Sequence, residues 1–180
     1  MSHPDVARLR RLLLPPPVSG GDAVDWGAIE RETLLRFPDD YREFVETYGG
    51  GEIDEYLSVK TPPAPGSPYG DVLDRINPAL PDPDQDEDFR ALGAGGDLPP
   101  LLPFVDSMHG DVAFWLCEGA PDDWRVVVFR RQAPYGTNRW PVFDGGMASF
   151  LMAVLTGEVN PFSAGFEANE RHVFTNWRGL

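Results

Sequence analysis

A glycine-terminated helical stretch, Trp26 to Glu52, constrains the fold of this chain more than any other segment. Large apolar residues recur within it at the spacing i, i+3, i+4 and i+7, which predicts one buried face of a helix. These residues are Tyr41, Phe44, Val45 and Tyr48. Pro38 and the two aspartates that follow it favour a helix start. Because Gly49 can close the helix and two more glycines follow, an extended segment is expected from Ile53.

A second helix is expected just before this one. Asp25 can accept hydrogen bonds from the free N–H groups at its start. The inward face of this helix would contain Trp26, Ile29, Thr33, Leu34 and Phe37. We therefore predict two amphipathic helices that meet at a corner formed by Phe37 and Pro38.

The residues of this helical corner belong to a longer pattern. Within the corner, the pattern consists of Trp26, Ile29, Glu30, Pro38, Asp40, Tyr41, Phe44, Tyr48, Gly49, Gly50 and Gly51. Later it includes Leu102-Pro103-Phe104, Gly110-Asp111, Phe114-Trp115, Val126-Val127-Val128 and Phe150-Leu151. Over about residues 26–158, this pattern resembles the signature of the SUKH (Smi/Knr) superfamily. Phe37 departs from it, since the superfamily usually has leucine at that position.

The segments after the corner have the composition of strands and of one more helix. We expect strands within residues 52–60, 101–105, 111–117, 126–129 and 139–143. A helix with Asp144 as its N-cap should follow and end at Gly157. The predicted fold class is α+β, with a mostly antiparallel or mixed central sheet of about five or six strands. The N-terminal helix pair and the C-terminal helix would pack on this sheet, as the resemblance also implies.

The length of 180 residues is typical of one domain. Residues 5–14 can form a short helix, and the prolines at 15–17 with the glycines at 20 and 21 would link it to the rest. We therefore divide the chain into an N-terminal helix and linker, residues 1–22, and one SUKH-like domain, residues 23–180. The aromatic tail after residue 158 is expected to pack on this domain or on a partner.

The charge of the chain limits the classes of partner. A formal net charge of −14 and a pI near 4.4 argue against nucleic acid and anionic membranes, because phosphate binding requires clustered lysine and arginine. A basic protein would be attracted, although an acidic balance also serves solubility alone. There is no segment of membrane-spanning length and no signal-peptide core, and the single Cys117 cannot form an intrachain disulfide. These features predict a soluble cytoplasmic protein.

The best candidate for chemistry is the run from Asp106 to Asp111, which contains His109. Two carboxylates and an imidazole could bind a divalent ion or share acid–base work. The spacing matches no named metal motif, and a turn between two strands favours the same residue types. The turn is the preferred interpretation, and we predict no catalytic residue, no metal site and no cofactor.

The resemblance implies a non-enzymatic binding protein. The superfamily contains bacterial immunity proteins of polymorphic toxin systems and a fungal cell-wall regulator. We expect an immunity protein that neutralises a cognate toxin, such as a nuclease, by stoichiometric binding, with a basic toxin domain as partner. The alternatives are a regulatory or scaffold module without a toxin and, less favoured, a metal-dependent enzyme at the turn with Asp106, His109 and Asp111. The oligomeric state is left open.

Two acidic groups are the candidate partner-binding residues. One comprises Asp82, Asp84, Asp86, Glu87 and Asp88, and the other comprises Glu52, Asp54 and Glu55. Charge and placement select them, not the superfamily pattern. The first group has a structural explanation as well, because a solvated loop or the first turn of a helix also favours acidic residues.

Overall fold

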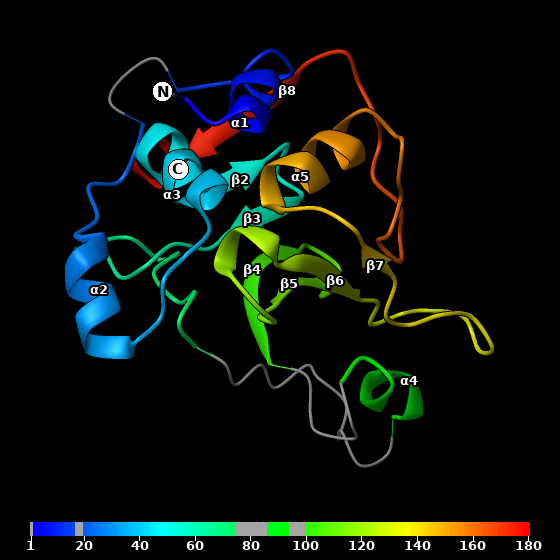
Figure 1. Ribbon diagram of the computed structural model, residues 1–180. Helices are drawn as coiled ribbons and strands as arrows, with labels where there is room; N and C mark the ends of the chain where they lie inside the picture. The colour runs from blue at the N-terminus through cyan, green and yellow to red at the C-terminus, as the bar shows by residue number, and fades with distance from the viewer. Residues whose placement is uncertain (1, 17–19, 75–85, 94–99) are drawn as a thin grey trace.

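The protein is built on an eight-stranded sheet with the strand order β1-β8-β2-β3-β4-β5-β6-β7 (Figure 1). The computed structural model describes residues 2–16, 20–74, 86–93 and 100–180. The strands are β1 (Leu13–Leu14), β2 (Gly51–Ile53), β3 (Leu57–Val59), β4 (Leu101–Ser107), β5 (Val112–Leu116), β6 (Arg125–Phe129), β7 (Val142–Phe143) and β8 (His172–Asn176). Among these described strands, only β1 and β8 pair in parallel. The predicted α+β class with a mixed sheet is confirmed.

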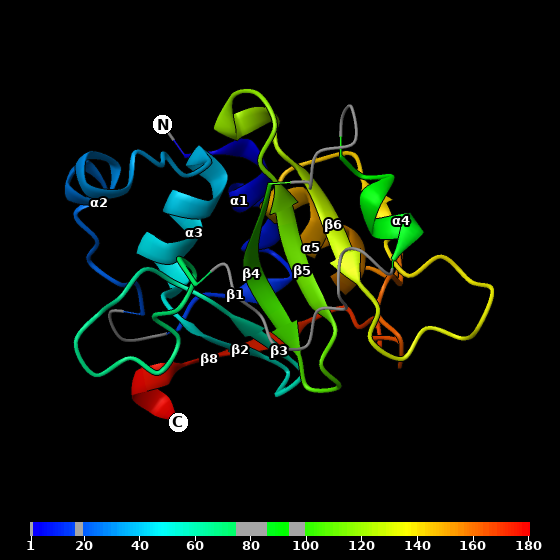
Figure 2. The same ribbon diagram turned by 90° about the horizontal axis from the view of Figure 1, so that it is seen from below.

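The helices lie on both faces of this sheet. They are α1 (Pro4–Leu9), α2 (Trp26–Thr33), α3 (Asp39–Tyr48), α4 (Glu87–Arg90) and α5 (Met147–Leu155), with short 3-10 turns η3 (Pro121–Asp123) and η4 (Trp177–Gly179). Helices α1, α3 and α5 contact one another above the sheet, and α4 lies below it (Figure 1). Figure 2 shows β4, β5 and β6 in front of α5 when the molecule is seen from below.

The sheet is larger than the predicted five or six strands for two reasons. Residues 52–60 form a hairpin of β2 and β3 instead of one strand, because Asp54 and Glu55 take left-handed backbone angles (φ 51° and 55°) and reverse the chain. The ends of the chain supply β1 and β8, and β8 lies between β1 and β2. Val6 and Leu9 of α1 are also buried. The division of the chain at residue 22 stays a prediction.

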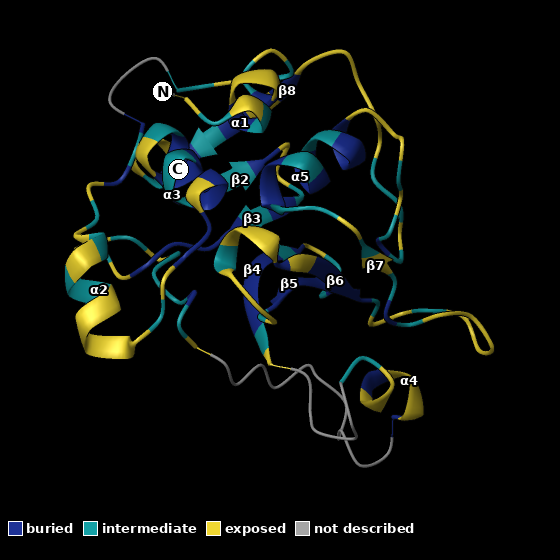
Figure 3. Cartoon of the chain, viewed as in Figure 1, coloured by how far each residue is buried: buried dark blue, intermediate teal, exposed yellow. Residues whose placement is uncertain are grey.

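Two hydrophobic clusters lie on opposite faces of the sheet. β5 shows the alternation: Trp115 belongs to the larger cluster beneath α3 and α5, and Phe114 belongs to the smaller one near α4. All five residues of β5 are therefore buried, as expected for a central strand covered on both sides. Figure 3 shows the buried residues concentrated in the sheet and in the inward sides of α3 and α5.

Helix α3 follows the sequence pattern closely, whereas α2 follows it only in part. Tyr41, Phe44, Val45 and Tyr48 are all buried, as predicted. No residue of α2 is buried, and Leu34, predicted on its inward face, is 91% exposed. Helix α2 ends at Thr33, before Leu34, and it packs on the larger cluster through Trp26 and Ile29, which are only half-buried. Trp26 packs edge-on against Phe37, which is buried as predicted. The predicted N-cap at Asp25 is confirmed by its bond from the Ala28 N–H.

The start of α5 is capped by a residue from α3, not by Asp144 as predicted. The Asp40 carboxylate accepts a hydrogen bond from the Ala148 N–H at 2.9 Å, and Gly146 stands at the N-cap position. Asp144 has 87% of its side chain exposed, and its ion pair within the described residues is with Arg125. Burial raises the pKa of Asp40, and the hydrogen bonds from the Ala148 and Tyr41 N–H groups partly offset this rise. Asp40, which belongs to the superfamily pattern, therefore connects α3 to α5.

The end of α3 and the glycines that follow it are hydrogen-bonded to residues from the N-terminal and C-terminal parts of the chain. The buried Asp22 carboxylate accepts hydrogen bonds from the Gly50 N–H (2.8 Å) and from Trp177 Nε1–H (3.0 Å). Asn176 donates to the Tyr48 carbonyl at 2.7 Å. These bonds hold β8 against β2 and fix the end of α3 relative to both strands.

Candidate functional site

Helix α4 is fixed in place by Asp86. The Asp86 carboxylate caps the helix by accepting a hydrogen bond from the Phe89 N–H at 3.0 Å. It also accepts one from Trp140 Nε1–H at 3.1 Å, and it lies 3.8 Å from the Arg139 guanidinium. Phe89 packs against Trp140 in the smaller cluster. These contacts hold α4 on the sheet face opposite to α3 and α5.

A turn with an exposed aromatic side chain faces α4. The Thr137 N–H donates to the Pro134 carbonyl at 3.1 Å, and Gly136 has φ of 79°, as in a type II turn. The Thr137 hydroxyl donates to the same carbonyl at 2.7 Å. This geometry places Tyr135 at the first central position of the turn, where its side chain is fully exposed.

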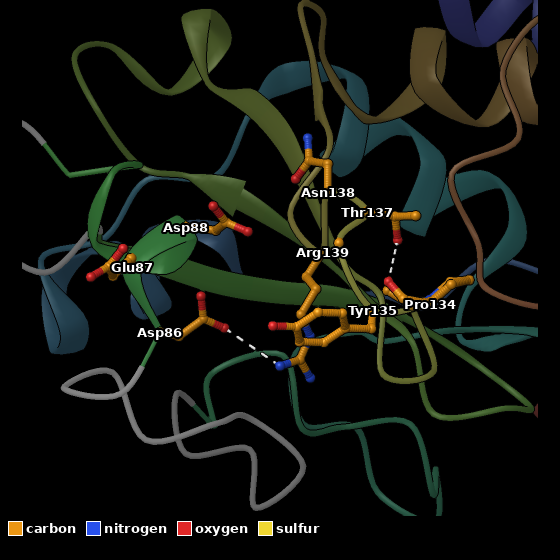
Figure 4. Close-up of a pocket in the computed structure, with 10 residues that line it drawn as sticks. Asp86, Glu87, Asp88, Pro134, Tyr135, Thr137, Asn138 and Arg139 are labelled. Atoms are coloured by element: carbon orange, nitrogen blue, oxygen red, sulfur yellow. Dashed lines mark hydrogen bonds and ion pairs between the residues drawn. The ribbon is translucent and has the colours of Figure 1, made fainter.

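A cleft of about 900 Å³ lies between α4 and this turn (Figure 4). Its walls are residues 86–88 and 133–139. Asp86 and Arg139 neutralise each other in the cleft, whereas Glu87 and Asp88 are exposed and have no ion pair within the described part of the chain. In Figure 4, Asp88 points from α4 toward the loop, and Glu87 lies farther from it. The cleft therefore carries uncompensated negative charge beside an aromatic ring.

The first predicted acidic group falls partly in this cleft. Asp82 and Asp84 lie outside the described residues. Asp86 is only 8% exposed and is already bonded to Phe89 and Trp140, so its first role is structural. Glu87 and Asp88 remain available to a partner. Their role in binding stays a prediction.

The second predicted acidic group lies elsewhere, on the β2–β3 hairpin. Glu52 accepts a hydrogen bond from the Tyr69 hydroxyl at 3.0 Å. Asp54 accepts one from the Val173 N–H at 2.8 Å and also pairs with His172. Glu55 is exposed at the turn. The structure thus does not gather the described members of the two acidic groups into one site, because α4 covers β5 and β6 whereas the hairpin pairs with β8.

The run from Asp106 to Asp111 contains the end of β4 and the β4–β5 turn, and its three candidate side chains have separate partners. Asp111 is fully buried and accepts hydrogen bonds from the Arg131 N–H, the Ser163 N–H and the Ser163 hydroxyl at 2.7–2.8 Å. His109 packs its ring against another ring, that of Tyr56. Across the described residues, no group of three or more His, Cys, Asp or Glu side chains is arranged to hold a metal ion.

Asp106, the third member of that run, is half-buried and belongs to an ion-pair cluster around the buried Lys60. Lys60 Nζ lies 2.7 Å from Asp106 and 2.5 Å from Asp71. Burial raises the pKa of Asp106, although the hydrogen bond from Lys60 opposes that rise. Burial alone would lower the pKa of Lys60, but its hydrogen bonds to the two carboxylates outweigh burial and raise it. Lys60 is therefore held as a cation that joins β4 to the loop after β3.

Replacing Asp111 by asparagine tests the structural role of this turn. We expect Asp111→Asn to lower the free energy of unfolding by about 2 kcal/mol. The amide NH₂ of asparagine would face a backbone N–H, which now donates a hydrogen bond to the carboxylate. Urea denaturation measures the change. His109→Ala is the matched control, with an expected change within about 0.5 kcal/mol. Equal losses for the two variants would contradict this assignment and favour a shared ion.

The fold and the cleft define an α+β protein with a helical layer on one sheet face and an acidic cleft on the other. The model of the SMI1 / KNR4 family (SUKH-1) matches residues 20–148, and the chain belongs to this family. The predicted superfamily membership is confirmed. The match begins before α2 and ends at the start of α5, so it includes the helical corner and β2 to β7.

The other comparisons add no relative. No curated protein and no solved structure matched this chain. Among the described residues, no helix has the length and apolar character required to cross a membrane.

Sequence reasoning found one wall of the cleft and missed the other. The acidic run indicated residues 86–88, but Tyr135 and Arg139 were not singled out. A local signal was present, because the sequence Pro134-Tyr135-Gly136 places an aromatic residue between two turn-forming residues. That signal predicts the turn, whereas only the fold brings it opposite α4.

Proposed function

We propose that this protein is an immunity protein that neutralises a cognate toxin in the cytoplasm by stoichiometric binding. Membership of the SMI1 / KNR4 family supports a binding function without catalysis. The observation that carries the proposal is the cleft beside α4, where Glu87 and Asp88 have no ion pair among the described residues. A basic toxin domain fits this charge and the net charge of −14.

The mechanism is electrostatic capture followed by blockade. Complementary potentials raise association rates more reliably than they raise affinity, so the acidic surface would speed the first encounter with a basic partner. The bound protein would then cover the part of the toxin that meets its own substrate. In this mechanism Glu87 and Asp88 act as partner-binding residues, and Glu55 and Glu52 on the hairpin are secondary candidates.

The first experiment identifies the partner. Pull-down from the native cell with mass spectrometry should recover a toxin domain, encoded next to this gene, at a stoichiometry of one to one. Addition of this protein should abolish the toxin's activity at equimolar concentration. Recovery of a partner that is not a toxin would contradict the proposal and favour the regulatory module.

Charge reversal tests the electrostatic step. The variant with Glu87→Lys and Asp88→Lys should bind the toxin domain about tenfold more slowly at low salt, because two steering carboxylates become cations. The difference should shrink at high salt, where screening shortens the reach of these charges. Stopped-flow association kinetics measure both rates.

A matched variant separates local charge from net charge. Glu30→Lys with Glu32→Lys on α2 changes the net charge by the same amount, and both positions are exposed. We expect a much smaller effect on the association rate. Equal slowing by the two pairs would show that only total charge matters and would remove the cleft from the mechanism.

A further inference from the structure

Tyr135 is the most exposed large hydrophobic residue in the described part of the molecule. It has no hydrogen bond and no ring contact within the described ranges, although tyrosine normally buries part of its ring. Tyrosine is also enriched among the residues that contribute most to binding at protein interfaces. A fully exposed ring beside a cleft therefore calls for an explanation beyond the stability of the fold.

The turn that carries Tyr135 is anchored at its base. Arg130 donates to the Asn138 carbonyl at 3.2 Å, and the Asn138 side chain accepts from the Trp140 N–H at 2.8 Å. Arg139 lies over the Phe129 ring, 5.4 Å from its centroid, and Trp140 is buried. Because the base is fixed, little conformational freedom is lost when the tip meets a partner. The turn therefore holds Tyr135 in an exposed position.

The opposite wall supplies a complementary charge. Asp88 points across the cleft toward the loop in Figure 4 and has no ion pair among the described residues. Arg139 does not neutralise Asp88, because the ion pair of Arg139 is with Asp86, at 3.8 Å. The cleft thus offers one aromatic face and at least one free carboxylate, with a volume of about 900 Å³ that admits several side chains.

We propose that this cleft binds an arginine side chain on an exposed segment of the protein partner, between the ring of Tyr135 and the carboxylate of Asp88. A planar guanidinium can stack on an aromatic face and pair with a carboxylate at the same time. Lysine can form the ion pair but stacks less well, so arginine is preferred. This inference rests on the proposed function and names the chemistry of the partner at that site.

A six-arginine peptide is the probe that tests this inference. In NMR spectra of the full chain, the peptide should shift the Tyr135 ring signals and the amides of residues 86–88 and 133–139. A six-lysine peptide should bind more weakly. Tyr135→Ala should weaken binding of the arginine peptide about tenfold, and Tyr135→Phe should keep most of it, because the stacking face remains. Asp88→Asn should weaken it as well.

Stability and position are controlled separately. Tyr135→Ala should leave the melting temperature unchanged, because the side chain makes no described contact. Leu34→Ala removes another exposed side chain far along the chain and should not change peptide binding. Shifts spread over all acidic surfaces, or equal binding by wild type and Tyr135→Ala, would overturn the inference.

The same variants distinguish this inference from the proposed function. If the toxin is neutralised equally well by wild type and Tyr135→Ala, the proposed function stands and the arginine site is wrong. If the arginine peptide binds at Tyr135 but no toxin partner is found, the site stands and the proposed function fails.

Discussion

Replacing Gly51 by alanine is expected to lower the free energy of unfolding by about 3 kcal/mol or more. A Cβ atom at this position would lie 2.2 Å from the Thr175 carbonyl oxygen and 2.9 Å from the Asn176 Cα. Both are backbone atoms of β8, so no side-chain rotation relieves the clash. For a chain of this length, the melting temperature should fall by about 6–12 °C. Urea and thermal denaturation measure the two quantities.

Gly179→Ala is the matched control for Gly51→Ala. It makes the same chemical change near the same end of the chain, but nothing lies within 4 Å of the added Cβ. Its expected effect is within about 0.5 kcal/mol. A loss below about 1 kcal/mol for Gly51→Ala would contradict the pairing of β2 with β8, since only that pairing brings Thr175 next to Gly51.

Gly51 also shows how far local sequence pattern reaches. The three glycines correctly predicted the end of α3, because a helix stop depends on neighbouring residues. The need for glycine at position 51 arises from β8, which lies more than a hundred residues later and has no strong strand signal. Single strands at the ends of the chain, such as the two-residue β1, are too short for any periodicity to reveal.

Prediction succeeded where the local sequence determines burial and failed where burial or capping depends on distant contacts. Helix α3 buries one face, and β5 is buried on both faces, so the apolar spacing of α3 and the continuous apolar run of β5 were informative. The cap of α5 was assigned to Asp144, the nearest acidic residue, but the structure uses Asp40 from another helix. A capping residue that comes from elsewhere in the chain leaves no signal near the helix it caps.

The candidate site was predictable in its charge and not in its shape. The acidic run indicated Glu87 and Asp88 from composition alone. The burial of Asp86 depends on Trp140, which is 54 residues away, and the cleft exists only because the fold places the Tyr135 turn opposite α4. Sequence can therefore indicate which residues attract a partner, while the contour that selects the partner's side chain follows from tertiary packing.

Replacing Trp140 by alanine is expected to have the largest effect on the candidate site. Its ring lies 4.8 Å from both the Phe89 and the Phe129 ring centroids, and it is almost fully buried. Loss of such a side chain costs about 3–5 kcal/mol of unfolding free energy. Because Phe89 is the buried residue of α4, its packing should be lost as well, and the wall that carries Asp88 should no longer be held. Denaturation measures the first effect.

Trp140→Phe separates packing from hydrogen bonding in the same position. The phenyl ring keeps much of the contact with Phe89, but it cannot donate to Asp86 as Trp140 Nε1–H does. A bond to a carboxylate contributes about 1.5–3 kcal/mol, so this variant should be destabilised less than Trp140→Ala. Binding of the six-arginine peptide should fall most in Trp140→Ala. If Trp140→Ala still folds and binds the peptide as wild type does, the packing of α4 on Trp140 does not form the peptide site. The peptide would then bind to carboxylates outside the cleft.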